Sequence, residues 1–396
     1  MIRYLILIQS LLGFWSMILL LICCNQKPHL QDGKNTTSIS HAVDTLLVAA
    51  DSTTALDITV YDHFDNGDAE FLFFYNGYSH HLYGFNLSEL RYDYLIPLSR
   101  NGQDGVGNIE SMYIHSLDSI FVYERGIVKL LNSAGQVKAS HNLIRSIPDD
   151  FGFLLTNPWF RLTYLPRTKT ILLNNIYGMM NRDKSLQKPF AVYYNLVTRT
   201  SEFAPFYYSD YVKAHRGNFG YLWGASILEA LGDGTVYYTF PVESRIYKQN
   251  VYTPNDYAEF DVPSNFTASI VDPLPAAGDR MAASKHLVEN PSYYGVLYDE
   301  YRQLFYRIHR SGRELEARDD ENEIRNVNFY ITVLDKDLRY IKEVELPKNT
   351  YLQYTWFVSR AGLCFNAASP FYRHLTDERN IEFHVYKFTR DEDEEP

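Results

Sequence analysis

Cysteine is nearly absent from this sequence. The 396 residues contain three cysteines, and two of them, Cys23 and Cys24, are adjacent at the end of an apolar N-terminal run. Cys364 is then alone in the body of the chain, which excludes an internal disulfide framework, so core packing must hold the fold together. Because Cys364 lies between Leu363 and Phe365, we expect it to be a buried small hydrophobic residue rather than a nucleophile.

Three other features are missing. Long apolar stripes with helical periodicity do not occur after the N-terminus, which excludes an α-solenoid and a Rossmann fold. An excess of basic residues is missing too: the net charge is -11, so a nucleic-acid partner is not expected. No Gly-x-Ser-x-Gly, His-Glu-x-x-His or phosphate-loop pattern occurs, which weakens the case for an enzyme without excluding one.

The N-terminus resembles an export signal. Arg3 is the only charged residue before the cysteine pair, and a long apolar stretch follows it. A basic start and an apolar stretch are typical of a signal segment. The end of this stretch, Leu21-Ile22-Cys23-Cys24, resembles a bacterial lipobox, in which a cysteine becomes the acylated first residue of the mature protein. We therefore predict a signal peptide over residues 1–23 and lipidation of Cys24, with Cys23 as the alternative site.

An uncleaved transmembrane anchor is the competing interpretation, because the apolar run is about long enough to span a bilayer. Either interpretation places the bulk of the chain outside the cytoplasm. Residues 24–43 are polar and lack periodicity, which predicts a flexible tether. Several such lipoproteins carry acidic residues directly after the acylated cysteine as a signal for export to the cell surface. No acidic residue directly follows Cys24, so we expect an outer-membrane lipoprotein that faces the periplasm.

Residues 100–143 show the pattern that the rest of the chain repeats. Four short apolar runs are separated by turn residues at 125–126 and 132–135, where glycine supplies positive φ and asparagine stabilises a tight reversal. The second run, 119–123, is apolar on both faces and must be covered on both sides. The last run, 137–143, alternates between apolar and polar residues and therefore has one solvent-exposed face. Polarity that rises outward in this way is typical of a propeller blade.

Six such units predict an all-β fold, a β-propeller of about six four-stranded blades over residues 44–390. The sixth unit supplies only three strands, and the spare run 44–50 would complete it and close the ring. We expect residues 46–48 of this run to pair with residues 383–386. Residues 391–396 are an acidic, solvated tail. The first run of each unit is predicted at residues 57–61, 109–114, 159–164, 222–228, 293–298 and 353–358.

Part of the pattern is similar to a known family. Residues 102–109, 118–122 and 128–135 resemble an NHL-type propeller repeat. Over most of residues 44–390 the exported chain resembles the Bacteroidetes-type lipoproteins grouped as domain of unknown function 4221. The resemblance implies a propeller of six or seven blades. It implies no established activity and carries over no catalytic residue.

The candidate binding residues lie in the links between units. Links from an outer strand to the next inner strand gather on one face around a propeller axis, where we expect a ligand to bind. The tryptophans there offer stacking surfaces, although each residue also has a structural explanation, as a tight turn or as core. The polar and tryptophan side chains that would take an anionic or sugar ligand are Arg100, Asn101, Asp104, Trp159, Arg216, Trp223, Arg280 and His286.

No metal site or cofactor is expected. His80 and His81 are adjacent strand residues, which point to opposite faces and cannot chelate one ion. The carboxylates of residues 62–68 resemble a calcium loop, but the twelfth position counted from Asp62 is Phe73 rather than glutamate. We interpret this segment as a β-turn between two strands.

Two functions remain open. The first is a membrane-tethered, non-catalytic propeller that binds a protein or glycan in the cell envelope. The second is a propeller hydrolase or lyase with an axial metal, because such enzymes build their sites from scattered side chains. Perturbed titrating groups at the axis would favour the enzyme, and a shallow aromatic face would favour the binding protein.

Overall fold

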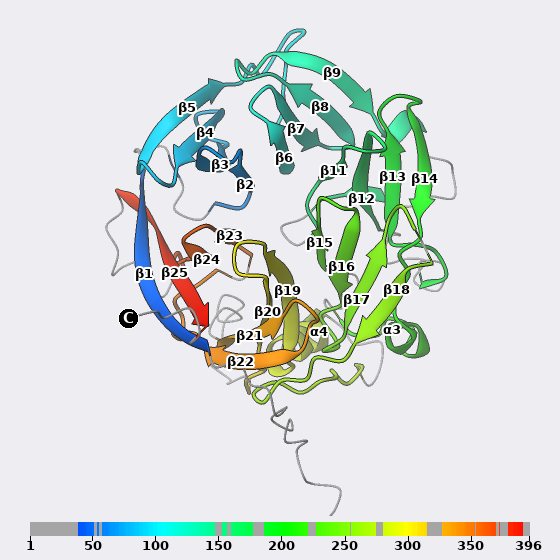
Figure 1. Ribbon diagram of the computed structural model, residues 1–396. Helices are drawn as coiled ribbons and strands as arrows, with labels where there is room; N and C mark the ends of the chain where they lie inside the picture. The colour runs from blue at the N-terminus through cyan, green and yellow to red at the C-terminus, as the bar shows by residue number, and fades with distance from the viewer. Residues whose placement is uncertain are drawn as a thin grey trace, which may run out of the picture. The chain divides into compact units, whose positions relative to one another are not determined.

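In the computed structural model, six antiparallel sheets are arranged in a ring (Figure 1). Contacts divide the chain into residues 1–36 and 37–396, and the ring belongs to the second unit. The predicted signal peptide, Cys24 and the acidic tail lie outside the described residues. The structure describes residues 39–50, 54, 58–146, 153–156, 160–176, 186–220, 227–253, 255–274, 280–314, 327–352, 354–369, 372 and 379–390.

The first three blades follow one another along the chain. Blade 1 contains β2 (Tyr61–Asp65), β3 (Glu70–Asn76), β4 (His81–Asn86) and β5 (Arg91–Pro97). Blade 2 contains β6 (Ser111–Ser116), β7 (Ser119–Glu124), β8 (Ile127–Leu131) and β9 (Val137–Asn142). Blade 3 contains β11 (Thr163–Leu165), β12 (Thr170–Ile176), β13 (Ala191–Asn195) and β14 (Thr200–Ala204), and β10 (Phe153–Leu155) also pairs with β12.

The remaining blades complete the ring. Blade 4 contains β15 (Ile227–Ala230), β16 (Thr235–Thr239), β17 (Ile246–Asn250) and β18 (Tyr257–Phe260). Blade 5 contains β19 (Ser292–Asp299), β20 (Leu304–Arg310), β21 (Phe329–Asp335) and β22 (Tyr340–Glu345). Blade 6 contains β23 (Trp356–Ser359), β24 (Gly362–Asn366), β25 (Asn380–Arg390) and β1 (Ile39–Ala49). Short helices lie in the links: η1 (Ile144–Ser146), α3 (Asp210–Ala214) and α4 (Arg280–Glu289).

The two ends of the chain close the ring, as the sequence predicted. β1 is the outer strand of blade 6 and runs antiparallel to β25, with Leu46 opposite Phe383 and Val48 opposite Ile381 (Figure 1). Val48 is fully buried, whereas its neighbour Leu47 is 49% exposed. β1 begins at Ile39, inside the stretch predicted as tether.

Burial follows the order of strands within each blade. The second strands are largely buried, and every residue of β16 and β20 is buried, because the neighbouring sheets cover them on both sides. The outer strands β5 and β9 alternate between more and less exposed residues. Aromatic pairs fill the seams between blades, such as Tyr237 of blade 4 and Phe305 of blade 5, whose ring centroids are 4.6 Å apart. Cys364 is buried, as predicted.

The inner strand of blade 1 is displaced from its predicted position. The sequence predicts it at residues 57–61, which include the apolar Ile58 and Val60, but the strand runs from Tyr61 to Asp65 and contains three polar residues. An innermost strand has one face on the axis, where polar side chains meet the interior of the ring rather than a neighbouring sheet. The predicted turn is present: the Asn66 and Asp65 side chains accept hydrogen bonds from the backbone N–H groups that follow them.

Candidate functional site

A cavity of about 390 Å³ lies at the axis of the ring. The inner strands β2, β6, β11, β15, β19 and β23 stand around the axis (Figure 1). All six contribute residues that line the cavity or directly continue into its lining. We call this cavity the axial pocket. Its wall is mixed: carboxylates, one guanidinium group and several aromatic rings all converge on it. Gly295 of β19 leaves room for the Trp356 ring, since a Cβ atom there would lie 3.3 Å from the indole nitrogen.

Arg161 crosses the ring at one end of the pocket. It precedes β11 of blade 3, and its guanidinium carbon lies 4.1 Å from the centre of the Tyr61 ring in blade 1. The same group donates hydrogen bonds to the Tyr61 hydroxyl and, at 3.3 Å, to the Trp356 carbonyl oxygen of blade 6. Blades 3 and 6 face each other in a six-bladed ring. The side chain therefore ties three blades together across the axis.

Asp62 of β2 points at the next blade. Its Oδ2 accepts a hydrogen bond of 2.6 Å from the backbone N–H of Ile114 in β6. Burial raises the pKa of Asp62 from 3.8 to about 6, although the Ile114 N–H and the positive charge of Arg161 act in the opposite direction. Burial also raises the pKa of the adjacent Tyr113 to about 12, with a further contribution from the Asp62 charge.

Glu229 of β15 repeats this arrangement between blades 4 and 5. Its carboxylate accepts a hydrogen bond from the Tyr298 backbone in β19. Burial raises the pKa of Glu229 from 4.5 to about 7, against the opposing charge of Arg161, and the negative charge of Asp62 adds to the rise. Asp62 and Glu229 thus bind the inner strand of the following blade, and both line the axial pocket.

The mouth of the pocket lies at the hairpins between inner and second strands. Gly232, Glu300 and Tyr301 are the exposed lining residues, and all three belong to these hairpins in blades 4 and 5. The Tyr301 hydroxyl donates a hydrogen bond of 2.6 Å to Asp65 of blade 1. Tyr301 therefore spans part of the mouth while its side chain remains 37% exposed.

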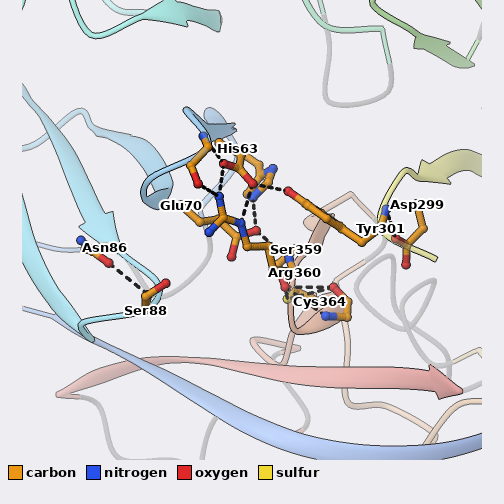
Figure 2. A network of polar contacts seen from close by, with 12 residues as sticks. His63, Glu70, Asn86, Ser88, Asp299, Tyr301, Ser359, Arg360 and Cys364 are labelled. Atoms are coloured by element: carbon orange, nitrogen blue, oxygen red, sulfur yellow. Dashed lines mark hydrogen bonds and ion pairs between the residues drawn. The ribbon is translucent and has the colours of Figure 1, made fainter. Parts of the chain in front are cut away.

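A polar network supports this side of the mouth. Figure 2 shows Tyr301 reaching from the blade 5 hairpin toward His63, Glu70 and Arg360. Arg360 of blade 6 binds both oxygens of Asp65, with Nε to Oδ2 at 2.7 Å and Nη2 to Oδ1 at 2.5 Å. The Arg360 hydrogen bonds hold the pKa of Asp65 well below its ordinary value. Glu70 Oε1 lies 2.7 Å from His63 Nε2 and accepts a hydrogen bond of 2.7 Å from the Arg360 backbone N–H.

Three of the residues predicted from the links lie near the start of blade 2. Arg100 lines a second cavity of about 390 Å³ together with Asn108 and Arg125, and it donates a hydrogen bond to the Gly77 carbonyl oxygen. Asn101 is exposed in the turn. Asp104 accepts a hydrogen bond of 3.0 Å from the backbone N–H of Val137, an interaction that fixes the link to β9.

The other predicted residues lie elsewhere. His286 of α4 is buried and donates from Nε2 to the Asp272 carbonyl oxygen at 2.7 Å. Arg216 is exposed after α3. Arg280 begins α4, but its side chain, like Trp159 and Trp223, lies outside the described residues. None of the described predicted side chains lines the axial pocket, and their role in binding stays a prediction.

The sequence contained one signal for the axial residues. Each innermost strand carries polar or charged residues where an apolar run would be expected, as Asp62 does in β2 and Glu229 in β15. Arg161 stands just ahead of β11 and shows no local pattern. Within the described ranges, no group of three or more His, Cys, Asp or Glu side chains is placed to hold a metal ion. No described helix has both the length and the apolar composition to cross a membrane.

The comparisons with known proteins agree with the fold. The crystal structure of a protein from Bacteroides vulgatus, described as a member of the DUF4221 family, matches with a TM-score of 0.76 at 17% identity. The match covers 90% of this chain and 100% of that one. A putative exported protein from Bacteroides fragilis matches with a TM-score of 0.56 at 11% identity, covering 91% and 98%. No curated protein matches the sequence. The model of the family described as "Domain of unknown function (DUF4221)" matches residues 36–345, and this six-bladed propeller therefore belongs to that family.

Proposed function

We propose that this protein is a lipoprotein of the cell envelope whose propeller binds a glycan in the axial pocket, without chemical conversion. The observation that carries the proposal is the pocket itself, in which charged groups and aromatic rings from all six blades converge. Its volume of about 390 Å³ lies within the range of small-ligand sites, about 300–1,000 Å³. A protein segment is the alternative partner.

The lining suits a sugar better than a flat protein surface. A sugar ring offers hydroxyl edges for hydrogen bonds and C–H faces for aromatic contact. The pocket supplies both: Asp62, Glu229 and Arg161 are polar, and Tyr113, Tyr298 and other rings stand beside them. A concave pocket enclosed by six strands accepts a narrow chain that enters from the hairpin side.

The location rests on the N-terminal sequence. The lipobox-like cysteine pair supports a lipid anchor at Cys24 in the outer membrane, with the propeller facing the periplasm. Cys24→Ala should move the protein from the membrane fraction to the soluble fraction, while Cys23→Ala should leave it in the membrane fraction. The reverse result would move the anchor to Cys23, and membrane retention in both variants would favour a transmembrane anchor.

The test of binding is to block the mouth. Gly232 lines the axial pocket, and a Cβ atom added there meets nothing within 4 Å, so Gly232→Trp should fill the entrance without straining the fold. Val197→Trp is the matched control, because Val197 is 67% exposed at the outer hairpin of blade 3. On a glycan array we expect Gly232→Trp alone to lose the wild-type signal. A wild-type protein that binds no glycan, or equal binding by both variants, would contradict the proposal.

A hydrolase or lyase is the second candidate, and one observation favours it. Asp62 and Glu229 share the pocket, and burial raises the pKa of both toward neutrality, as acid and base catalysis requires. Such an enzyme with an axial metal is the alternative function that the sequence also allows. Incubation of a bound glycan with the protein decides between the candidates: an intact glycan supports binding alone, and new reducing or unsaturated ends support catalysis.

A further inference from the structure

The charges of the axial pocket do not balance. Among the described residues that line it, Asp62, Glu229 and Glu300 are acidic, and Arg161 is the one arginine or lysine. His63 also lines the pocket, but its Nε2 lies 2.7 Å from Glu70 and is thereby engaged. With the carboxylates ionised, the lining carries more negative than positive charge.

Arg161 does not neutralise the two deep carboxylates by direct contact. Its guanidinium group lies against the Tyr61 ring and donates to the Tyr61 hydroxyl and the Trp356 carbonyl oxygen. Among the described residues, neither Asp62 nor Glu229 has a basic side chain within ion-pair distance of 4.0 Å. Arg161 therefore acts on both carboxylates through its field alone.

The two carboxylates also keep free acceptor capacity. A carboxylate has two oxygens with about four acceptor sites. Asp62 accepts hydrogen bonds from the backbone N–H groups of Ile114 and His63, and Glu229 accepts one from the Tyr298 backbone. Both side chains are only partly buried because they line the cavity. A ligand with several N–H donors can occupy the remaining sites.

We propose that the glycan bound in the axial pocket carries a free amino group, as an unacetylated amino sugar does, and that Asp62 and Glu229 receive its ammonium group. This inference rests on the proposed function. An ammonium group supplies three donors and a positive charge, and the aromatic rings of the pocket attract the same charge. A neutral N-acetyl group lacks the charge, and an acidic sugar adds repulsion.

Proton release provides an independent sign of such binding. Burial raises the pKa of Asp62 to about 6 and that of Glu229 to about 7, so both carry protons for part of the time near neutral pH. A cation beside them lowers the pKa of both and expels these protons. The charged and polar groups that face them are Arg161 from blade 3, His63 on β2, and the N–H groups of β6 and β19.

The test is calorimetric titration of the full-length protein with two probes. The first is a β-1,4-linked glucosamine disaccharide, and the second is its N-acetylated counterpart. We expect the free amine to bind at least about tenfold tighter than the N-acetylated probe, and at least about tenfold tighter at about pH 7 than at about pH 5, because Asp62 ionises in this range. Titrations in two buffers of different ionisation enthalpy should show net proton release.

Two variants locate the effect. Asp62→Asn keeps an acceptor for the Ile114 N–H and should remove the preference for the amine, while the N-acetylated probe binds as before. Asp93→Asn is the matched control, since Asp93 is exposed on strand β5 and does not line the axial pocket, and it should retain the preference. A thermal melt of each variant confirms that it is folded.

Each other outcome overturns the inference. Equal or tighter binding of the N-acetylated probe contradicts the amino-group proposal and leaves glycan binding standing. If neither probe binds, and no glycan binds on the array, the proposed function of glycan binding is contradicted as well. Tighter binding of a lysine amide than of the disaccharide would indicate that the pocket binds a protein partner rather than a glycan.

Discussion

Replacing Asp62 by asparagine should stabilise the protein at alkaline pH. Asp62 is held among the inner strands, where its Oδ2 accepts a hydrogen bond from the Ile114 N–H. Asparagine has nearly the same shape and keeps one oxygen to accept that bond, so the substitution removes the charge and little else. In the axial pocket, proposed as a site for a positively charged ligand, the buried carboxylates lower the stability of the ligand-free protein.

The magnitude follows from the pKa. Burial raises the pKa of Asp62 from 3.8 to about 6, and each tenfold change in proton affinity is worth about 1.4 kcal/mol. The folded protein binds this proton more tightly than the unfolded chain does. The corresponding stabilisation is complete below about pH 4 and is lost as the pH rises through about 6, for a total of about 3 kcal/mol. The Asp62→Asn variant has no carboxyl group at this position, so its stability does not fall in this pH range for this reason.

Urea unfolding at two pH values measures the effect. At about pH 8 we expect Asp62→Asn to exceed the wild type by about 2 to 3 kcal/mol in unfolding free energy, and at about pH 4 we expect the two to agree. Asp93→Asn is the control: Arg91 lowers the pKa of Asp93 on the exposed strand β5, so its pH dependence should have the opposite sign. A difference for Asp62→Asn that does not change with pH, or a loss of stability at alkaline pH, would refute the reasoning.

Three further substitutions test the ring and its supports. Val48→Asp should lower the unfolding free energy by more than about 3 kcal/mol in urea, because a charge would enter a fully buried position, whereas Leu47→Asp on the exposed face should stay within about 0.5 kcal/mol. Arg161→Met should lower the unfolding free energy by about 2 to 4 kcal/mol, because it removes a partly buried cation–π contact and its hydrogen bonds, and an unchanged unfolding midpoint would show that the crossing side chain is not structural. Arg360→Ala should reduce the urea midpoint at neutral pH, with a difference that shrinks in acid as Asp65 is protonated in both proteins; a difference that grows in acid would contradict the ion pair.

The fold was predictable because the second strands of the blades are unambiguous. Segments such as β3 and β7 are apolar on both faces, and a strand covered on both sides requires neighbouring sheets. The three-stranded sixth unit and the spare run near Leu46 then required ring closure, which the β1–β25 pairing confirms. Register in this pair follows from the burial of one face, since a one-residue slip would exchange Val48 with Leu47.

The site was harder to predict because its residues are scattered. Asp62, Arg161 and Glu229 belong to three different blades and meet only when the ring closes. Each stands in or beside an inner strand, and the polar residues of these strands make them hard to recognise in the sequence. For this reason β2 was predicted four residues too early. The link residues were more conspicuous, but Arg100 lines a separate cavity and none of the other described link residues lines the axial pocket. Which face of a ring is hollow depends on side-chain packing that no single segment contains.

The most direct test of the central claim is a crystal structure of the protein with the glucosamine disaccharide bound. The account predicts a sugar ring between the inner strands, with its amino nitrogen at hydrogen-bond distance from the carboxylates of Asp62 and Glu229. Electron density for the sugar at the cavity beside Arg100, with the axial pocket unoccupied by it, would contradict the account.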